Sequence, residues 1–167
     1  MIEKDFVNID NFLSEGIVKW SSPSNIALVK YWGKKNNQIP QNPSISFTLS
    51  KSLTTTSVEF KPKKNKVNSI IFEFDGQKDH KFGQKIKLFI SNIEKYFSFL
   101  KNHDINIKSE NNFPHSSGIA SSASSMSALA SCLVDIEKIN SNEKDDSYFL
   151  KKKSFIARLG SGSASRS

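Results

Sequence analysis

The chain has 167 residues, of which 37% are hydrophobic, and a formal net charge of +8. This length suffices for one domain whose core needs neither disulfides nor a structural metal. The single cysteine, Cys132, excludes an intramolecular disulfide, and its apolar neighbours predict a buried thiol rather than a nucleophile. No apolar run approaches the length of a membrane span and no signal segment opens the chain, so we expect a cytoplasmic protein without a membrane partner.

The net positive charge raises the question of nucleic-acid binding. The lysines are scattered over several stretches, with little arginine and with no helix-turn-helix, zinc or RNA-binding signature. A solvated, lysine-rich surface therefore explains the charge better than a nucleic-acid partner does, and its field would favour capture of a small polyanion. The lysine-rich stretches are residues 61–66, 78–87 and 151–153.

The first half of the chain has the pattern of short strands. β-branched and aromatic residues gather in segments that are separated by turn formers, among them Pro23, Pro40 and Pro43. The Asp75-Gly76 dipeptide closes the last of these segments as a turn. The predicted strands are residues 17–20, 25–32, 44–50, 54–60 and 69–74.

The apolar period changes in the second half of the chain. From Phe82 to Leu100, apolar residues recur at steps of three and four, which predicts an amphipathic core helix. Ile105 and Ile107 then alternate with polar neighbours and predict one more strand. Strands that come first and helices that come later favour an α+β fold, with a mixed sheet packed against helices, over a regularly alternating doubly wound sheet.

A glycine- and serine-rich stretch, residues 115–125, leads into a helix that we expect from about Gly118 to Ile136. A helix N-terminus offers free amides and the positive end of the helix dipole, and small side chains let a triphosphate lie against it. The stretch lacks the Lys-Ser/Thr ending of a P-loop. An ordinary helix whose serine and alanine face packs closely on a neighbour therefore stays open as an alternative.

Two further segments concentrate polar chemistry. In residues 24–34, strand alternation would place Lys30, Trp32 and Lys34 on one side and Tyr31 on the other, beside a strand end. A sheet edge protected by lysines is the alternative there. The end of the chain resembles an anion cradle, because its glycines and serines admit an oxyanion and its arginine offers a planar fork. A flexible Gly/Ser tail is the alternative.

Together these segments closely resemble the diphosphomevalonate decarboxylase family of the GHMP kinase superfamily. Residues 24–34 are similar to its signature Asn-Ile-Ala-Leu-Ile-Lys-Tyr-Trp-Gly-Lys, and residues 112–124 to its phosphate loop Asn-Asn-Phe-Pro-Thr-Ala-Ala-Gly-Leu-Ala-Ser-Ser-Ala. Residues 160–167 are similar to Gly-Ser-Gly-Ser-Ala-Cys/Ser-Arg-Ser, and residues 40–49 to Pro-x-Asn-x-Ser-Leu-Ser-x-Thr-Leu. The order and the approximate spacing of the segments agree as well.

The resemblance covers the chain from about Val18 to its end and implies the α+β N-terminal domain of the GHMP kinases. We therefore expect an N-terminal extension at residues 1–16 and the ATP- and diphosphate-binding domain at residues 17–167. The C-terminal domain of the family is expected to be absent from this chain. The family's catalytic aspartate, assigned as the general base, lies in that second domain, so we expect the chain alone to be inactive.

The resemblance also implies an activity, the ATP-dependent decarboxylation of mevalonate 5-diphosphate to isopentenyl diphosphate in the mevalonate pathway. ATP phosphorylates the tertiary hydroxyl, and the new phosphate then leaves as the carboxylate departs as carbon dioxide. ATP and Mg²⁺ are the implied cofactors, with Mg²⁺ bridging the ATP phosphates. Two alternatives stay open: a related kinase or decarboxylase that acts on mevalonate or its monophosphate, and a non-catalytic binding fragment. Homodimer formation is also open.

Site residues follow from the resemblance, motif by motif. Arg166 would orient the substrate carboxylate with Asn25 beside it, and Lys34 would share the catalytic role. The implied substrate ligands are Tyr31, Trp32, Gly33, Lys34, Ser161, Gly162, Ser163, Ala164, Ser165 and Arg166. The implied ligands of the ATP phosphates are Gly118, Ala120, Ser121, Ser122 and Ser124. No residue is implied as a direct metal ligand.

The chain departs from the family pattern at the mouth of the phosphate loop. His115, Ser116 and Ser117 replace Thr-Ala-Ala, which adds polarity there, and we expect no change of substrate from it. No carboxylate of the chain lies in a motif that matches the family's catalytic aspartate. The carboxylates that follow the predicted helix are expected to have surface roles: Asp135, Glu137, Glu143, Asp145 and Asp146.

Overall fold

The structure is a computed structural model of the whole chain. It describes residues 3–10, 12–64, 69–78, 80–114, 118–141 and 145–167. His115, Ser116, Ser117 and Glu143, which the sequence analysis singled out, lie outside the described residues, as does Lys66. None of the helices formed by the described residues is long and apolar enough to cross a membrane.

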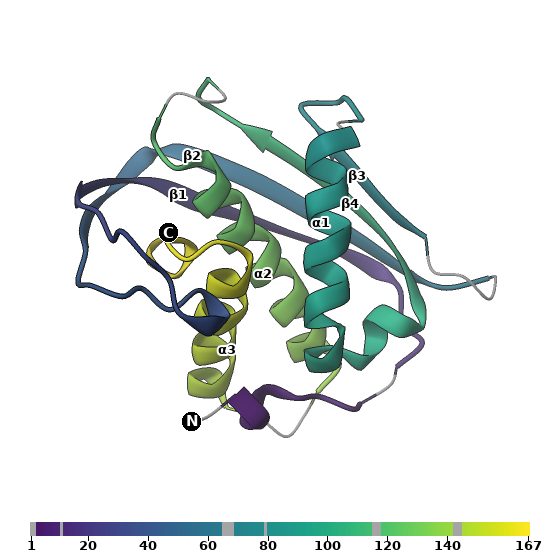
Figure 1. The fold of residues 1–167 in the computed structure, drawn as a ribbon. Coiled ribbons are helices and arrows are strands. Elements are labelled where there is room, and N and C mark those ends of the chain that lie inside the picture. The colour runs from purple at the N-terminus through teal and green to yellow at the C-terminus, as the bar shows by residue number, and fades with distance from the viewer. Residues whose placement is uncertain (1–2, 11, 65–68, 79, 115–117, 142–144) are drawn as a thin grey trace.

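The chain folds into a four-stranded mixed sheet with helices packed on one face, which confirms the predicted α+β class (Figure 1). The strand order is β1-β2-β4-β3, in which β1, β2 and β4 pair antiparallel and β3 pairs parallel to β4. The strands are β1 (Gly16–Val29), β2 (Ile45–Pro62), β3 (Ile70–Phe74) and β4 (His103–Asn111).

The first four predicted strands are in fact two long ones. β1 runs through Pro23, which was expected to separate two strands, and β2 likewise spans both of its predicted segments. A proline is tolerated there because β1 lies at an edge of the sheet and the register shifts between Pro23 and Ser24. The second predicted strand, residues 25–32, also extends too far, since β1 ends at Val29.

Three helices cover the sheet. Helix α2 packs on β1 and β2 and lies between the sheet and α3, while α1 packs on β3 (Figure 1). The helix predicted from Phe82 to Leu100 stops earlier, at Ile93, and continues as the 3₁₀ turns η3 (Glu94–Tyr96) and η4 (Ser98–Lys101). The helices are α1 (His80–Ile93), α2 (Ser121–Ile139) and α3 (Asp146–Gly160).

Helix α3 was not predicted, although its N-terminal signal is present. The Asp145 carboxylate accepts a hydrogen bond from the backbone N–H of Tyr148 at 2.7 Å, which caps the helix. The run Lys151–Lys153 hides the helical period, because an uninterrupted lysine run is typical of solvated surface. In the structure Phe155 and Ile156, just beyond this run, are buried in the core.

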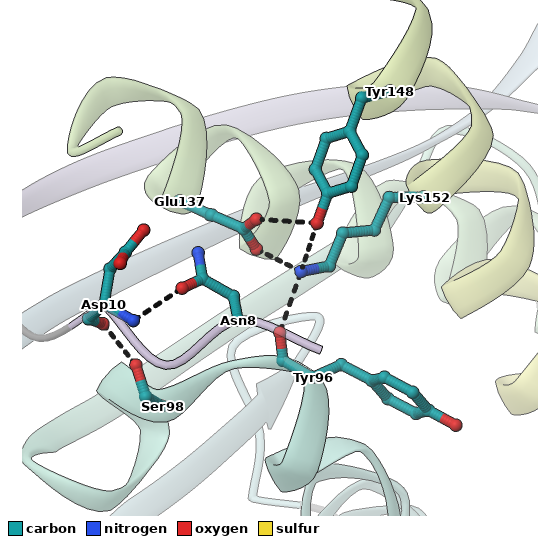
Figure 2. Close-up of polar contacts among 7 residues, drawn as sticks. All are labelled: Asn8, Asp10, Tyr96, Ser98, Glu137, Tyr148 and Lys152. Carbon is teal, nitrogen blue, oxygen red and sulfur yellow. Dashed lines mark hydrogen bonds and ion pairs between the residues drawn. The ribbon is translucent and has the colours of Figure 1, made fainter. Parts of the chain in front are cut away.

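A buried ion pair joins α2 to α3. Lys152 is 0% exposed and donates hydrogen bonds to the Glu137 carboxylate and, at 2.8 Å, to the Tyr96 carbonyl (Figure 2). Its Nζ also lies 4.4 Å from the centre of the Phe97 ring. The surface roles expected for Glu137 and for Lys152 are therefore wrong. A charge survives at such depth only where a countercharge and hydrogen bonds replace its hydration.

The remaining carboxylates and the cysteine follow expectation more closely. Asp146 is exposed and pairs with Lys138 at 2.6 Å, whereas Asp135 is half-buried between Lys153 and the Trp20 indole. Cys132 is buried as predicted, and its thiol faces the carbonyl of Thr56 at 3.3 Å. Burial raises the pKa of Cys132 to about 12, so the thiol is no nucleophile at neutral pH.

Replacing the buried ammonium should be costly. Lys152→Met keeps an unbranched side chain but leaves the Glu137 carboxylate buried without its cation. We expect the free energy of unfolding, measured by urea denaturation, to fall by about 3–5 kcal/mol. Lys151→Met, at an exposed position one residue earlier, is the matched control and should change it by less than about 0.5 kcal/mol. Equal effects of the two substitutions would contradict a stabilising role for the pair.

Candidate active site

The three polar segments singled out in the sequence meet at one end of the molecule. The segment after β1, the loop before α2 and the turn after α3 line a common open cavity of about 350 Å³. Figure 1 shows the C-terminus beside β1, near the end of α2 at which that helix begins. The cavity is lined by Asn25, Ala27, Lys30, Tyr31, Gly118, Ala120, Ser163 and Arg166.

The segment after β1 is a loop rather than the predicted strand, so its side chains do not alternate as expected. The Asn42 side chain turns it, donating to the Lys30 carbonyl at 3.2 Å and accepting from the Trp32 N–H at 2.9 Å. As a result Lys30 and Tyr31 both line the cavity, although alternation assigned them to opposite sides. The Trp32 side chain is 88% exposed and does not line it.

Lys34 lies next to this cavity but does not line it. Its ammonium donates to the Gln38 side chain at 2.5 Å and stands 5.8 Å from the centre of the Tyr31 ring. Gln38 belongs to a short 3₁₀ turn, η2 (Asn36–Gln38), and the loop is closed by a 2.9 Å bond from the Gln41 N–H to the Gly33 carbonyl. The implied substrate ligands Lys34 and Tyr31 therefore share one loop.

Close packing around Gly162 in the C-terminal cradle leaves no room for a side chain. A Cβ on Gly162 would stand 2.6 Å from the Tyr31 hydroxyl and 3.2 Å from the Gln38 carbonyl oxygen, so only glycine fits without displacement. Ala164 is buried, and its N–H closes a turn onto the Ser161 carbonyl at 2.8 Å. Ser163 lines the cavity, whereas Ser165 is exposed and lines a neighbouring hollow.

Arg166 reaches the cavity from the short turn η5 (Ala164–Arg166). Its guanidinium donates to the Ser44 hydroxyl and lies 5.9 Å from the centre of the Tyr31 ring. Its Nε is buried and has no hydrogen-bond partner among the described residues. An orphaned donor of this kind fits an anion in the cavity, because a guanidinium presents paired N–H groups to carboxylates and phosphates.

Asn25 is 2% exposed and forms a hydrogen bond with Ser167, the residue after Arg166. Its amide donates to the Ser167 hydroxyl at 2.6 Å, and the carbonyl of Ser167 accepts from Ser127 at 3.0 Å. The hydroxyl of Thr48 on β2 also approaches the Arg166 carbonyl at 3.5 Å. The end of the chain is thus tied to β1, β2 and α2, which is unlike a flexible Gly/Ser tail.

The loop before α2 has an unusual backbone. Gly118 and Ala120 both take left-handed conformations, with φ of +80° and +58°, and the helix begins at Ser121 rather than at the predicted Gly118. The Ser24 hydroxyl donates to the Ile119 carbonyl and so ties the loop to β1. The first amides of the helix have no partner within the helix itself, which is the general basis of anion binding at helix N-termini.

The serines of α2 divide between two environments. Ser121 is half-buried and Ser122 is exposed at the helix start, near the cavity. Ser124 is buried and shares a 2.6 Å hydrogen bond with Thr54 on β2, and Ser127 accepts one from Ser22 on β1 at 3.2 Å. The alternative of a serine face packed on a neighbour therefore applies to Ser124 and Ser127, which face the sheet.

Sequence reasoning missed several contributors to this site. Lys30 lines the cavity but was not assigned a role, and the hydroxyl partner of Arg166, Ser44, received none either. Ser44 does lie within the recognised segment 40–49, which was the available signal. Within the described part of the chain, no group of three or more histidines, cysteines or carboxylates could hold a metal ion.

Comparison with known proteins agrees with this geometry. The family model described as diphosphomevalonate decarboxylase-like N-terminal domain matches residues 22–167. The chain belongs to this family. The diphosphomevalonate decarboxylase of Debaryomyces hansenii is 34% identical over 158 residues, which cover 88% of this chain and 39% of the relative. The chain thus spans about two fifths of the length of such curated relatives.

Solved structures of the family share the fold. The mevalonate diphosphate decarboxylase of Staphylococcus aureus superposes with a TM-score of 0.75 at 35% identity, covering 92% of this chain and 44% of that one. The mevalonate diphosphate decarboxylase of Enterococcus faecalis, from a structure of its mevalonate diphosphate mediated ATP binding mechanism, superposes with a TM-score of 0.72 at 31% identity. The superposition covers 90% of this chain and 44% of the Enterococcus faecalis chain.

A methyl group at Gly162 should test the packing of the cradle. In Gly162→Ala the new Cβ must displace the Tyr31 hydroxyl, so we expect the free energy of unfolding, measured by urea denaturation, to fall by about 1–3 kcal/mol. Gly83→Ala in α1, where a Cβ meets only ordinary contacts with Phe72 at 4.0 Å, is the control and should not lower the free energy of unfolding. An unaltered free energy of unfolding in Gly162→Ala would contradict the close packing of Gly162 on Tyr31.

Proposed function

We propose that this chain forms the ATP- and diphosphate-binding half of the active site of an ATP-dependent diphosphomevalonate decarboxylase, a lyase of the mevalonate pathway. The observation that carries the proposal is one cavity lined by residues from three of the four family motifs. The reaction would convert mevalonate 5-diphosphate to isopentenyl diphosphate. Cations and amides that converge on one cavity are suited to hold such a polyanion still.

The substrate diphosphate would lie against the loop after β1 and the turn after α3. Lys34 and Tyr31 would contact it from the loop, and Ser161 and Ser163 from the turn, whose Gly162 packs against the Tyr31 hydroxyl. Of the remaining implied ligands, Trp32 and Ser165 are exposed, and Ala164 is buried with its N–H bonded to the Ser161 carbonyl, so it would shape the turn rather than bind the substrate. The unpaired Nε of Arg166 supports its proposed role, in which the guanidinium orients the substrate carboxylate.

ATP would bind with its phosphates at the start of α2. The left-handed Gly118 and Ala120 bring the loop to the cavity, and the helix dipole favours negative charge there. Ser121 and Ser122 at the helix start are the proposed hydroxyl ligands, and Ser124 supports the loop from the sheet through Thr54. Bound ATP with Mg²⁺ supplies the phosphoryl group that makes the tertiary hydroxyl of the substrate a leaving group.

Several finer points belong to the same proposal. The general base would come from the second domain that the resemblance implies, so residues 1–167 alone should bind ligands without turnover. The cytoplasm is the proposed location, since the buried free thiol suits a reducing compartment. A homodimer is also proposed, because an apolar patch on the β1–β2 end of the sheet is exposed: Ile26, Leu28, Val29, Ile45 and Phe47.

Calorimetry and a carbon dioxide assay together test the function. Residues 1–167 should bind mevalonate 5-diphosphate and ATP with Mg²⁺, and should prefer the diphosphate to mevalonate 5-phosphate and to mevalonate. Turnover by this chain would contradict the assignment of the base to another domain. Tighter binding of the monophosphate would indicate a related kinase or decarboxylase instead.

The arginine provides a sharper test. Arg166→Ala should lower the affinity for mevalonate 5-diphosphate by about tenfold or more and leave ATP affinity almost unchanged, because a charge-assisted hydrogen bond is worth roughly 1.5–3 kcal/mol. Arg158→Ala, which removes a guanidinium of α3 that does not line the cavity, is the matched control. Equal loss of both affinities in Arg166→Ala would overturn the role given to Arg166.

A further inference from the structure

Residues 3–10 lie outside the region matched by the family, which begins at residue 22, yet Phe6 and Asn8 among them are buried. The Phe6 ring is buried and stacks on Phe155 of α3, with 4.8 Å between the ring centres. Figure 2 shows the chain continuing past Asn8 to Asp10, whose carbonyl accepts a hydrogen bond from Ser98. Residues 3–10 of the predicted N-terminal extension thus pack against the rest of the domain.

Glu3 ties this segment to two other parts of the molecule. One of its carboxylate oxygens accepts hydrogen bonds from the Lys95 ammonium at 2.8 Å and the Tyr96 hydroxyl at 2.5 Å. The other accepts from the Asn37 amide at 3.0 Å. The hydrogen bonds from Lys95 and Tyr96 lower the pKa of Glu3, which keeps it a carboxylate at neutral pH. Glu3 therefore connects the helical layer to η2.

Turn η2 needs such support. Asn37 and Gln38 are consecutive non-glycine residues with left-handed backbones, at φ of +58° and +60°. This conformation is unfavourable for residues that carry a Cβ and persists where surrounding contacts fix it. The contact from Glu3 to Asn37 acts on one of these two residues from outside the loop.

The same turn sits against the candidate diphosphate site. The Gln38 side chain accepts the hydrogen bond from the Lys34 ammonium. The Gln38 carbonyl oxygen lies 3.2 Å from the place that a Cβ on Gly162 would occupy, so it backs the C-terminal cradle. A displacement of η2 would therefore move a cation of the site and open the wall behind the glycine.

We propose that Glu3 is a positioning residue, which holds η2 through Asn37 and thereby fixes Lys34 and the back of the cradle for the substrate diphosphate. Residues 3–10 are then a strap that precedes the region matched by the family model. The inference rests on the proposed function for its ligand, but the strap itself is a property of the free protein. Hydrogen exchange of the free protein tests the strap, and affinity for the diphosphate tests the positioning role.

The experiment compares three variants of the 167-residue chain. Glu3→Ala removes the carboxylate, and Asn37→Asp replaces the amide donor by an acceptor while keeping its shape and its tolerance of a left-handed backbone. In the double variant E3Q/N37D the new amide can donate to residue 37 and still accept from Lys95 and Tyr96, which regenerates the connection with donor and acceptor exchanged. Glu15→Ala, which removes an exposed glutamate just before β1, is the control.

We expect both single variants to raise amide hydrogen exchange in residues 33–41 about tenfold, with exchange in β1, β2 and α2 unchanged. The affinity for mevalonate 5-diphosphate should fall several-fold in both, and E3Q/N37D should restore both readouts towards the wild-type values. A purely structural role of Glu3 beside Lys95 would leave Asn37→Asp without effect.

Unchanged exchange in residues 33–41 of Asn37→Asp, or failure of the double variant to restore it, would overturn the strap. Altered exchange with unaltered diphosphate affinity would overturn the positioning role. A wild-type chain that binds no diphosphate would overturn the proposed function and the ligand part of this inference, whereas the exchange of residues 33–41 would still decide whether the strap exists.

Discussion

The buried ion pair between Glu137 and Lys152 is the constraint on which the arrangement of the helices depends. It joins the last turns of α2 to the middle of α3, and the bond from Lys152 to the Tyr96 carbonyl includes the turns after α1 (Figure 2). Each partner buried alone would carry a large desolvation penalty, so alternative placements of α3 that separate the charges are strongly disfavoured. The direction of α3 is therefore set by polar as well as apolar packing.

That direction decides where the functional segments lie. Helices α2 and α3 run antiparallel, so the start of α2 and the end of α3 come to the same end of the molecule, beside β1 (Figure 1). The positive end of the α2 dipole and the Arg166 guanidinium then face one cavity, in which the loop after β1 adds Lys30. Three segments that are distant in sequence thus line one cavity, and its positive groups support the proposed binding of anions there.

The segments that line the cavity could be predicted from the sequence, whereas their mutual placement could not. Membership of the family, the α+β class, the buried Cys132 and a helix after Gly118 all followed from local patterns. Local patterns could not show that Ser124 turns to Thr54 on the sheet, or that Lys30 and Tyr31 reach the same cavity. Those outcomes depend on neighbours that are far away along the chain.

The sequence by itself determined which segments line the candidate site, because glycines, serines and cations in a fixed order are recognisable without the fold. Only the tertiary structure decided which charged residues are buried and which partners they have. Lys152 and Glu137 are indistinguishable from surface residues in the sequence, and Glu3 lies in an extension that resembles no motif. Burial of a charge is decided by whether a partner meets it in space, and that partner is supplied only when the chain has folded.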